Sequence, residues 1–330
     1  TFGGALWVNY AYQEWKSPDQ GKKTGLNFDN LRLSFDGTHG ETLLFSGQYR
    51  LYGYTRAIHH AWFGYRWSEA DQIELGVTQV PFGLLPFASH SFWFGLGYYV
   101  GVEDDYDSGI KWTHEGGAWD LNLAYFANEE LNDATNLNRY SVDLVRSGED
   151  QNEEFSQGNL RVAYTIGKGT ENSSQFGLSG QYGGIDNREV DKYGDRWHGA
   201  FHYLGRYGAW NPEIQVTRYE YNPENPEGVD DRLILMGNLT STRHVAAKGT
   251  LINANLRKFW DVDWGPVKGF NAYYNYSHLL KDEADFRDSQ LHNPGCVFQA
   301  GPHWVWVDFL IGKNAWYLND SPEASGMGPG

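Results

Sequence analysis

Residues 5–13 read ALWVNYAYQ, and in this stretch apolar or aromatic side chains alternate with polar or small ones. If Leu6 and Val8 lie on one face of an extended strand, Trp7 and Asn9 lie on the opposite face. Unpaired backbone N–H and C=O groups cost several kcal/mol each in a bilayer, so only helices and closed sheets cross one, and a tilted strand of about 9–11 residues is long enough. The stretch is therefore typical of a strand with one face toward lipid and the other toward a wet lumen.

The same alternation recurs along the chain, and no long apolar helix interrupts it. Fifteen segments show it: 5–13, 30–36, 43–51, 56–67, 71–80, 106–114, 118–127, 158–167, 174–184, 195–204, 209–220, 248–259, 266–277, 294–302 and 303–314. The pattern predicts an all-β fold, a transmembrane antiparallel β-barrel formed by one domain over residues 1–330. A closed bacterial barrel normally has an even number of strands. We therefore expect 16 strands, the last of them beyond Gly330.

The composition fits such a barrel and excludes several other classes of protein. Mean hydropathy is -0.60, yet 16% of the residues are aromatic, and Trp and Tyr suit a membrane–water interface. The formal net charge of -16 argues against a nucleic-acid partner, which needs a basic surface. The single cysteine, Cys296, excludes an internal disulfide framework and a cysteine-based zinc site. Motifs of serine hydrolases, zinc proteases and phosphate-binding loops are absent, so we expect no enzyme.

The connections between the segments alternate in length, as in outer-membrane barrels with short periplasmic turns and long outer loops. Long connections are expected at 14–25, 81–105, 128–157, 185–194, 221–247, 278–293 and from 315 onward. Loop 81–105 has an apolar body and an acidic exit, which favours a constriction loop folded into the lumen. Residues 128–157 are expected to form a long acidic extracellular loop, either as a vestibule that concentrates cations or as a plain solvated surface.

Two sets of charged side chains are expected to face each other in the lumen. The lumen-facing positions of the second to fourth segments carry the basic set: Arg32, Arg50, Arg56, His60 and Arg66. The constriction loop and the next segment supply the packing anchors Phe92 and Trp93, the acidic residues Glu103, Asp104, Asp105 and Asp107, and the further lumen candidate Lys111. Opposite charges across a narrow passage create a transverse field. The alternative is that these charges form wall salt bridges that only brace the barrel.

The stretch DDYDSG at 104–109 places carboxylates at alternate positions, which suit a hard cation. Asp105 and Asp107 are therefore candidate ligands of a structural Ca²⁺, although the acidic residue that ends an EF-hand loop is missing. Two histidine pairs, His59–His60 and His198 with His202, lack a third ligand in the sequence pattern. We therefore interpret them as lumen or interface side chains.

Several stretches resemble the phosphate-selective porin O and P superfamily of Gram-negative outer membranes. They are VTQVPFG at 77–83, YYVGVEDDYDSGIKW at 98–112, SGQYRLY at 46–52, GTLINANL at 249–256, YNYSHLLKDEADFRDSQ at 274–290 and VDFLIGKN at 307–314. The resemblance implies a trimeric, 16-stranded porin with an inward-folded third loop. It does not carry phosphate selectivity with it, because the phosphate channels of that family use arginine stacks and clustered lysines, and this chain has 26 Lys plus Arg against 42 Asp plus Glu.

Together these features predict a homotrimeric porin in the bacterial outer membrane, in contact with lipid and lipopolysaccharide, through which small hydrophilic solutes or ions diffuse passively. A channel selective for a dicarboxylate, another anion or a sugar is the nearest alternative. A lipid hydrolase built on the barrel is a more distant one, supported in the sequence by Ser89 next to His90.

Overall fold

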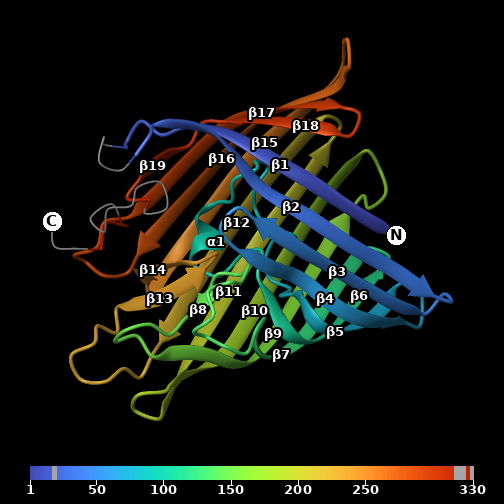
Figure 1. Cartoon of the computed structure of the whole chain (residues 1–330). Coiled ribbons are helices and arrows are strands. Elements are labelled where there is room, and N and C mark those ends of the chain that lie inside the picture. Colours follow the sequence, from blue (N-terminus) through green and yellow to red (C-terminus); the bar gives the residue numbers. More distant parts are fainter. Residues whose placement is uncertain (17–20, 316–324, 328–330) are drawn as a thin grey trace.

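The computed structural model describes residues 1–16, 21–315 and 325–327. Nearly all of this chain is antiparallel β-sheet that curves around an interior (Figure 1). The strands of the main sheet are β1 (Phe2–Tyr12), β2 (Thr24–His39), β3 (Leu43–Tyr52), β4 (Arg56–Arg66), β5 (Asp71–Gln79), β6 (Tyr106–Gly116), β7 (Trp119–Glu129), β9 (Asn152–Ile166), β10 (Asn172–Asn187), β11 (Lys192–Tyr207), β12 (Trp210–Asn222), β15 (Lys248–Trp264), β16 (Val267–Lys281), β17 (Ser289–Ala300), β18 (His303–Asp308) and β19 (Ile311–Lys313). The sheet counts 16 strand segments in chain order, and β18 and β19 pair with successive stretches of β17.

The predicted all-β barrel architecture is confirmed, and each of the fifteen predicted segments falls on a strand of this sheet. Several strands are longer than predicted: β10 has 16 residues and β15 has 17. Because about 9–11 tilted residues span a bilayer, these strands continue beyond its thickness. The connections expected at 185–194 and 278–293 shorten accordingly to 188–191 and 282–288. Part of the connection at 14–25 and most of the stretch from 315 onward lie outside the described residues.

The two faces of the wall differ as the alternation predicts. In β1, Leu6 is 68% exposed and Val8 is 56% exposed, whereas the intervening Trp7 is half-buried. In β9, Leu160 is exposed on the outside while Asn159 is buried inside. An apolar exterior and a polar interior are what a strand between lipid and lumen requires.

The first and last strands of the sheet order, β1 and β18, contact each other through side chains. Every neighbouring pair of strands is antiparallel, so β1 and β18 run in the same direction. No backbone pairing joins them among the residues that the structure describes, and the sheet is not closed there. The Trp7 ring instead lies 5.0 Å from the Trp306 ring and 5.0 Å from the Phe92 ring, measured between centroids.

Outer connections form a second, three-stranded sheet of β14 (Ser241–Ala246), β13 (Leu233–Asn238) and β8 (Asp143–Leu144). The alternation pattern missed this sheet, because it lies in the connections expected at 128–157 and 221–247. The structure also contains α1 (Leu96–Tyr99), a helix of four residues, and no helix in the described part of the chain is long and apolar enough to cross a membrane.

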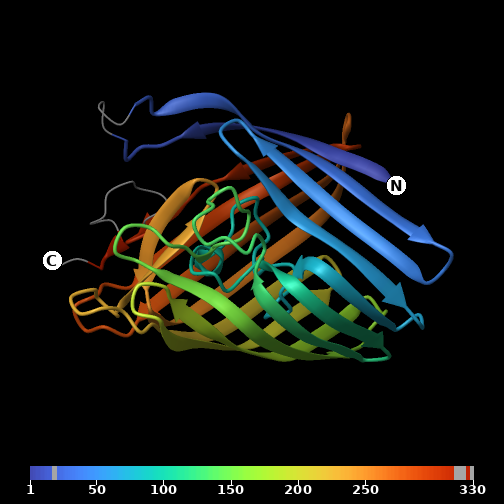
Figure 2. The same ribbon diagram turned by 60° about the horizontal axis from the view of Figure 1, so that its bottom comes forward.

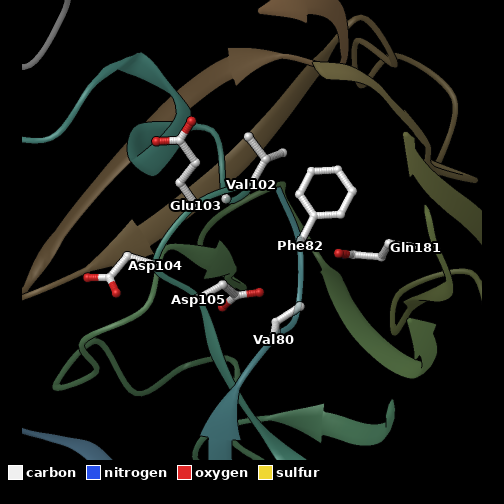
Figure 3. A pocket seen from close by; sticks show the side chains of 8 residues that line it. Val80, Phe82, Val102, Glu103, Asp104, Asp105 and Gln181 are labelled. Carbon is white, nitrogen blue, oxygen red and sulfur yellow. The ribbon is translucent and has the colours of Figure 1, made fainter. Parts of the chain in front are cut away.

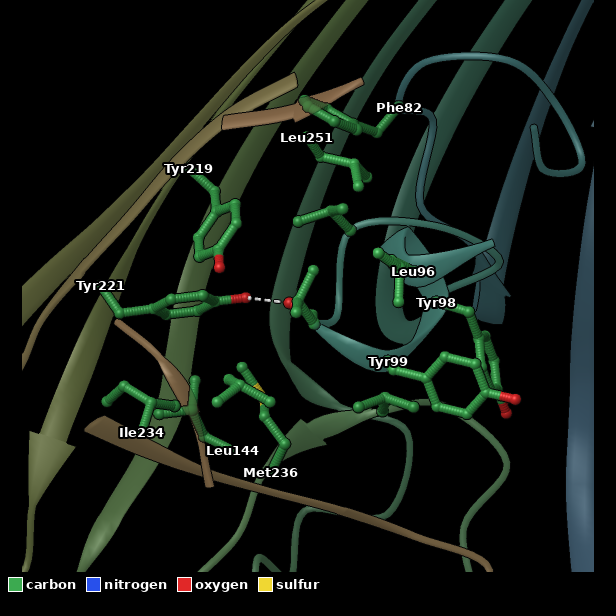
Figure 4. Packing of buried hydrophobic residues seen from close by; sticks show 14 of the residues in the cluster. Phe82, Leu96, Tyr98, Tyr99, Leu144, Tyr219, Tyr221, Ile234, Met236 and Leu251 are labelled. Atoms are coloured by element: carbon green, nitrogen blue, oxygen red, sulfur yellow. Dashed lines mark hydrogen bonds between the residues drawn. The ribbon is translucent and has the colours of Figure 1, made fainter. Parts of the chain in front are cut away.

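A buried hydrophobic cluster fills part of the interior (Figure 4). It combines the loop after β5, the inner face of β12 to β16 and the small sheet: Phe82, Leu96, Tyr98, Tyr99, Val100, Val102, Leu144, Tyr219, Tyr221, Ile234, Met236, Leu251 and Leu279. Tyr221 donates a hydrogen bond from its hydroxyl to the carbonyl oxygen of Val100, at 3.0 Å. The cluster therefore fixes the loop inside the sheet.

Candidate pore constriction

Loop 81–105 leaves β5 and lies inside the curved sheet, as Figure 2 shows. Hydrogen bonds anchor it on the opposite wall. Its anchors are hydrogen bonds from Gly83 N to Ser179 Oγ (3.0 Å), Leu84 N to Gln215 Oε1 (2.7 Å), Arg161 Nε to Gly83 O (2.8 Å), Asn255 Nδ2 to Ala88 O (2.9 Å) and His90 N to Asn275 Oδ1 (3.2 Å). All five partners are side chains of buried wall residues, so these five backbone groups of the loop are satisfied by the protein itself. The predicted inward fold of this loop is confirmed.

Gly83 is the position where this anchoring demands glycine. Its φ is +63°, which favours glycine, and a Cβ there would lie 2.4 Å from Gln215 Oε1. Gln215 accepts from Leu84 N at that place, so the close approach of loop and wall depends on the missing side chain.

The inward side chains differ in exposure between the wall beneath the loop and the wall formed by β2 and β4. Polar wall residues of β9 to β15 lie buried beneath it, among them Gln181, Gln215 and Asn253. The inward residues Arg32 and His60 on the wall formed by β2 and β4 remain half-exposed. Water-accessible space therefore lies between the loop and the strands β1 to β5.

The acidic exit of the loop does not present its charges as one group, because its side chains point in different directions (Figure 3). Asp104 has a φ of +52°, in the left-handed region that Asp tolerates better than most residues, and this turn redirects the chain. Glu103 points to the far wall and accepts from Gln215 Nε2 at 3.2 Å and Asn253 Nδ2 at 2.5 Å. Burial raises the pKa of Glu103 to about 8, so its carboxyl is largely protonated at neutral pH.

Asp104 is the acidic residue that turns toward the arginines. Its carboxylate accepts a hydrogen bond from the Tyr140 hydroxyl at 2.5 Å. The Arg50 guanidinium lies over the ring of the same tyrosine, 4.2 Å from the ring centroid. Burial raises the pKa of Asp104, while Arg50 and Arg32 lower it. Arg50 and Asp104 therefore both contact Tyr140, while a transverse field across the passage stays a prediction.

Arg32 and Arg50 are register partners on β2 and β3, so two positive charges sit side by side. Such a pair repels, and each guanidinium rests on a different aromatic face, Arg32 on Trp7 at 4.7 Å and Arg50 on Tyr140. Hydrogen bonds within their own strands hold both, from Arg32 Nε to Asn30 at 3.1 Å and from Arg50 Nε to Gln48 at 2.7 Å. Arg32 and Arg50 therefore form a basic patch on the water-accessible wall.

A β-bulge separates Arg56 from this patch. The pairing of β3 with β4 shifts between Gln48 and Tyr49, so that Gln48 faces His60 and Tyr49 faces Ile58. The extra residue, His59, is buried, and its Nδ1 lies 2.8 Å from Nδ1 of His60. A one-residue slip in register moves the side chains beyond it to the other face of the sheet. Ala57 therefore pairs with Arg50 and points inward, whereas Arg56 pairs with Leu51 and is exposed.

The remaining predicted residues occupy three further places. Arg66 is at the turn end of the wall, where its Nη2 donates to Gln72 at 3.1 Å and it lines a cavity of about 560 Å³. Lys111 forms an ion pair with Glu74 at 3.0 Å, which is the wall salt bridge of the alternative interpretation. Phe92 packs on Trp7, and Trp93 packs edge-on against Phe92 at 5.5 Å.

Asp105 and Asp107 do not face Arg32 and Arg50 but lie next to Asp143 of β8. All three are buried, and Asp143 belongs to an interior part of the acidic loop 128–157. Arg139 in that loop is 0% exposed and contacts Glu129 at 3.2 Å and Asp143 at 2.9 Å. Much of this loop is therefore packed inside the molecule, which differs from the solvated surface considered above. Sequence reasoning missed Tyr140 and Asp143, because their roles depend on contacts across more than 30 residues.

The Ser89–His90 pair does not form a catalytic dyad. Ser89 Oγ contacts Ser91 Oγ and the Trp93 carbonyl oxygen, each at 2.9 Å, whereas the His90 ring contacts the Asn211 carbonyl oxygen at 3.1 Å. Burial and Arg257 lower the pKa of His90 to about 3. The ring is neutral at pH 7, so its 3.4 Å contact with Glu213 is a polar contact and not an ion pair.

Comparison with solved structures identifies the same fold in outer-membrane proteins. OmpT of Vibrio cholerae, an outer membrane protein in its trimer form, is 15% identical, with 94% of this chain and 87% of that chain covered at a TM-score of 0.59. The outer membrane channel DcaP of Acinetobacter baumannii is 10% identical, with coverage of 94% and 88% and a TM-score of 0.61. An anion-selective porin from Comamonas acidovorans is 13% identical, with coverage of 94% and 88% and a TM-score of 0.57. No family model and no curated protein matches the sequence. At these identities the likeness shows a porin-type outer-membrane β-barrel fold.

Proposed function

We propose that this protein is an outer-membrane porin through which small hydrophilic solutes and ions diffuse passively between loop 81–105 and the strands β1 to β5. The observation that carries the proposal is the loop anchored across the interior, with the half-exposed Arg32 left on the opposite, water-accessible side. A loop held by buried hydrogen bonds sets a fixed passage size, and the facing wall supplies its charge. The solute undergoes no chemistry in this proposal.

The basic patch favours anions within that proposal. Arg32 and Arg50 lie side by side, while the Asp104 carboxylate is engaged by Tyr140. The names of two similar structures, an anion-selective porin and the channel DcaP, agree with a channel role. The resemblance to the phosphate-selective porin O and P superfamily supports the same class of protein, without phosphate selectivity.

Planar bilayers test the channel directly. Purified full-length protein should insert in stepwise conductance increments that persist at constant voltage, since an anchored loop leaves one open passage. Folded protein that binds bilayers without any conductance would contradict a porin. A lipid-hydrolysis assay on the same sample should show no turnover, and turnover that depends on an outward-facing serine would favour the hydrolase alternative.

We also propose a homotrimer surrounded by lipid and lipopolysaccharide. The trimer form of the similar OmpT and the trimeric state that the family resemblance implies support this assembly. Exposed outer side chains such as Leu6 and Phe63 provide apolar surface for either lipid or a neighbouring copy. Mass measurement of the detergent-solubilised protein distinguishes a trimer from a monomer.

A further inference from the structure

Three buried carboxylates from separate segments meet beside the exit of loop 81–105. Asp105 ends that loop, Asp107 belongs to β6, and Asp143 belongs to β8. One carboxylate oxygen of each lies within 4.8 Å of the corresponding oxygens of the other two. The three side chains are 7%, 1% and 2% exposed, respectively.

Two of these carboxylates carry oxygens with nothing to satisfy them. Asp105 Oδ1 and Asp107 Oδ1 are buried and have no hydrogen-bond partner among the residues that the structure describes. A buried polar atom of a charged group without a partner costs the full desolvation of that atom. The arrangement is therefore incomplete as a set of protein side chains alone.

The surrounding charges do not neutralise the group. Six buried carboxyl groups gather in this region: Asp105, Asp107, Glu129, Glu130, Asp143 and Glu154. In the described part of the chain, the guanidinium groups that bind them are those of Arg139, which contacts Glu129 and Asp143, and Arg196, which contacts Glu154. Two positive charges leave most of this negative charge without compensation.

The geometry fits a calcium ion. Calcium binds oxygen ligands at about 2.3–2.6 Å, so two ligands of one ion lie at most about 5 Å apart, which accommodates the 4.8 Å spacing. We propose that Asp105, Asp107 and Asp143 bind one Ca²⁺, with the partnerless Oδ1 atoms of Asp105 and Asp107 among its ligands. The ion would join the exit of loop 81–105, the wall strand β6 and the outer loop that carries β8. This inference goes beyond the channel function and does not depend on it.

Protonation is the competing way to neutralise the same group. Burial and the charge of Asp143 raise the pKa of Asp105, which shows how strongly the site disfavours uncompensated charge. A protonated cluster has no need of an ion, so calcium binding distinguishes the two.

Calorimetric titration with CaCl₂ tests the site in the full-length protein, refolded in detergent without lipopolysaccharide and treated with EDTA. We expect one Ca²⁺ per chain and a rise in melting temperature of at least about 2 °C at saturation. The absence of a binding heat and of a melting shift in the wild type would overturn the proposal.

Two variants and one control locate the ion. Asp105→Asn and Asp143→Asn should each weaken Ca²⁺ affinity at least tenfold, and Asp105→Asn should not lower the melting temperature without calcium, because it removes repulsion. Asp150→Asn is the matched control, since it removes one charge from the same outer connection, where Asp150 contacts only His244 among the described side chains. Wild-type affinity in Asp105→Asn, or an equal loss in Asp150→Asn, would refute this site.

Discussion

Replacing Arg32 by alanine should shift the ion preference of the channel toward cations. Arg32 is the half-exposed member of the basic patch, so a permeating ion can approach its guanidinium from the water-accessible side. Two unit charges about 4 Å apart interact by about 1 kcal/mol in water. Loss of the arginine charge makes the site less favourable for an anion by about 1 kcal/mol and more favourable for a cation by about the same amount. The sum of about 2 kcal/mol corresponds to roughly a 30-fold change in the ratio of anion to cation permeability.

Salt reduces this upper limit. At 0.1 M salt the Debye length is about 10 Å, and ions rarely sit at the closest approach, so we expect a change of about 3- to 10-fold in the permeability ratio. The measurement is the reversal potential under a KCl gradient, for wild type and Arg32→Ala in the same bilayers. Raising the salt on both sides should shrink the difference.

Arg56→Ala is the matched control, because it removes an arginine from the adjacent strand that the bulge turns outward. Its reversal potential should equal that of the wild type. Arg50→Ala should act in the direction of Arg32→Ala, with a smaller effect because Arg50 is 7% exposed and covered by Tyr140. Equal shifts in Arg32→Ala and Arg56→Ala would refute the assignment of the basic wall.

Three further predictions concern the parts that hold the constriction. Arg139→Met leaves Glu129 and Asp143 buried without their cation, so it should lower the free energy of unfolding in urea by about 3–5 kcal/mol. Arg232→Met removes the partner of the exposed Asp230 and Asp285 and should change the free energy of unfolding little. Similar losses in the two variants would contradict the role of burial. Tyr221→Phe removes the donor to the buried Val100 carbonyl oxygen, which should cost about 1–3 kcal/mol and speed proteolysis within loop 81–105, and unchanged cleavage would count against this anchor. The lowered pKa of His90, about 3 against 6.5, means that the unfolded chain binds its proton first as pH falls, so stability from the neutral ring is complete above pH 6.5 and is lost toward pH 3. The advantage in melting temperature of wild type over His90→Gln should therefore shrink from pH 7 to pH 4, and a constant difference would show that this ring does not titrate there.

The wall could be predicted from the sequence because its periodicity is local. In a strand, each residue takes the opposite face from its neighbours, so the polarity of Leu6 and Asn9 already indicates their sides of the sheet. The inward fold of loop 81–105 was predictable for a related reason, since a long apolar segment such as LGYYVGV cannot remain in water without cost.

The orientation of individual charges was not predictable. The alternation of polar and apolar side chains is interrupted at Ala57–Ile58 and His59–His60, but this interruption does not indicate which residue is the extra one. His59 is the extra residue, and the bulge that it forms turns Arg56 outward. The left-handed φ of Asp104 separates Glu103 from Asp105, although the three are consecutive and alike in charge. The bulge and the turn at Asp104 both depend on contacts with neighbouring segments, and those segments are distant in sequence.

The net charge of -16 is therefore a poor guide to what the pore prefers. A permeating ion responds mainly to charges within a Debye length, about 10 Å at 0.1 M salt. Along the acidic exit of the loop, Glu103 is turned to wall amides, Asp105 is turned to Asp143, and Asp104 is bound by Tyr140. On the facing wall, the half-exposed Arg32 and its neighbour Arg50 carry two positive charges against the one carboxylate of Asp29, so an acidic protein of this kind presents a basic patch to its own passage.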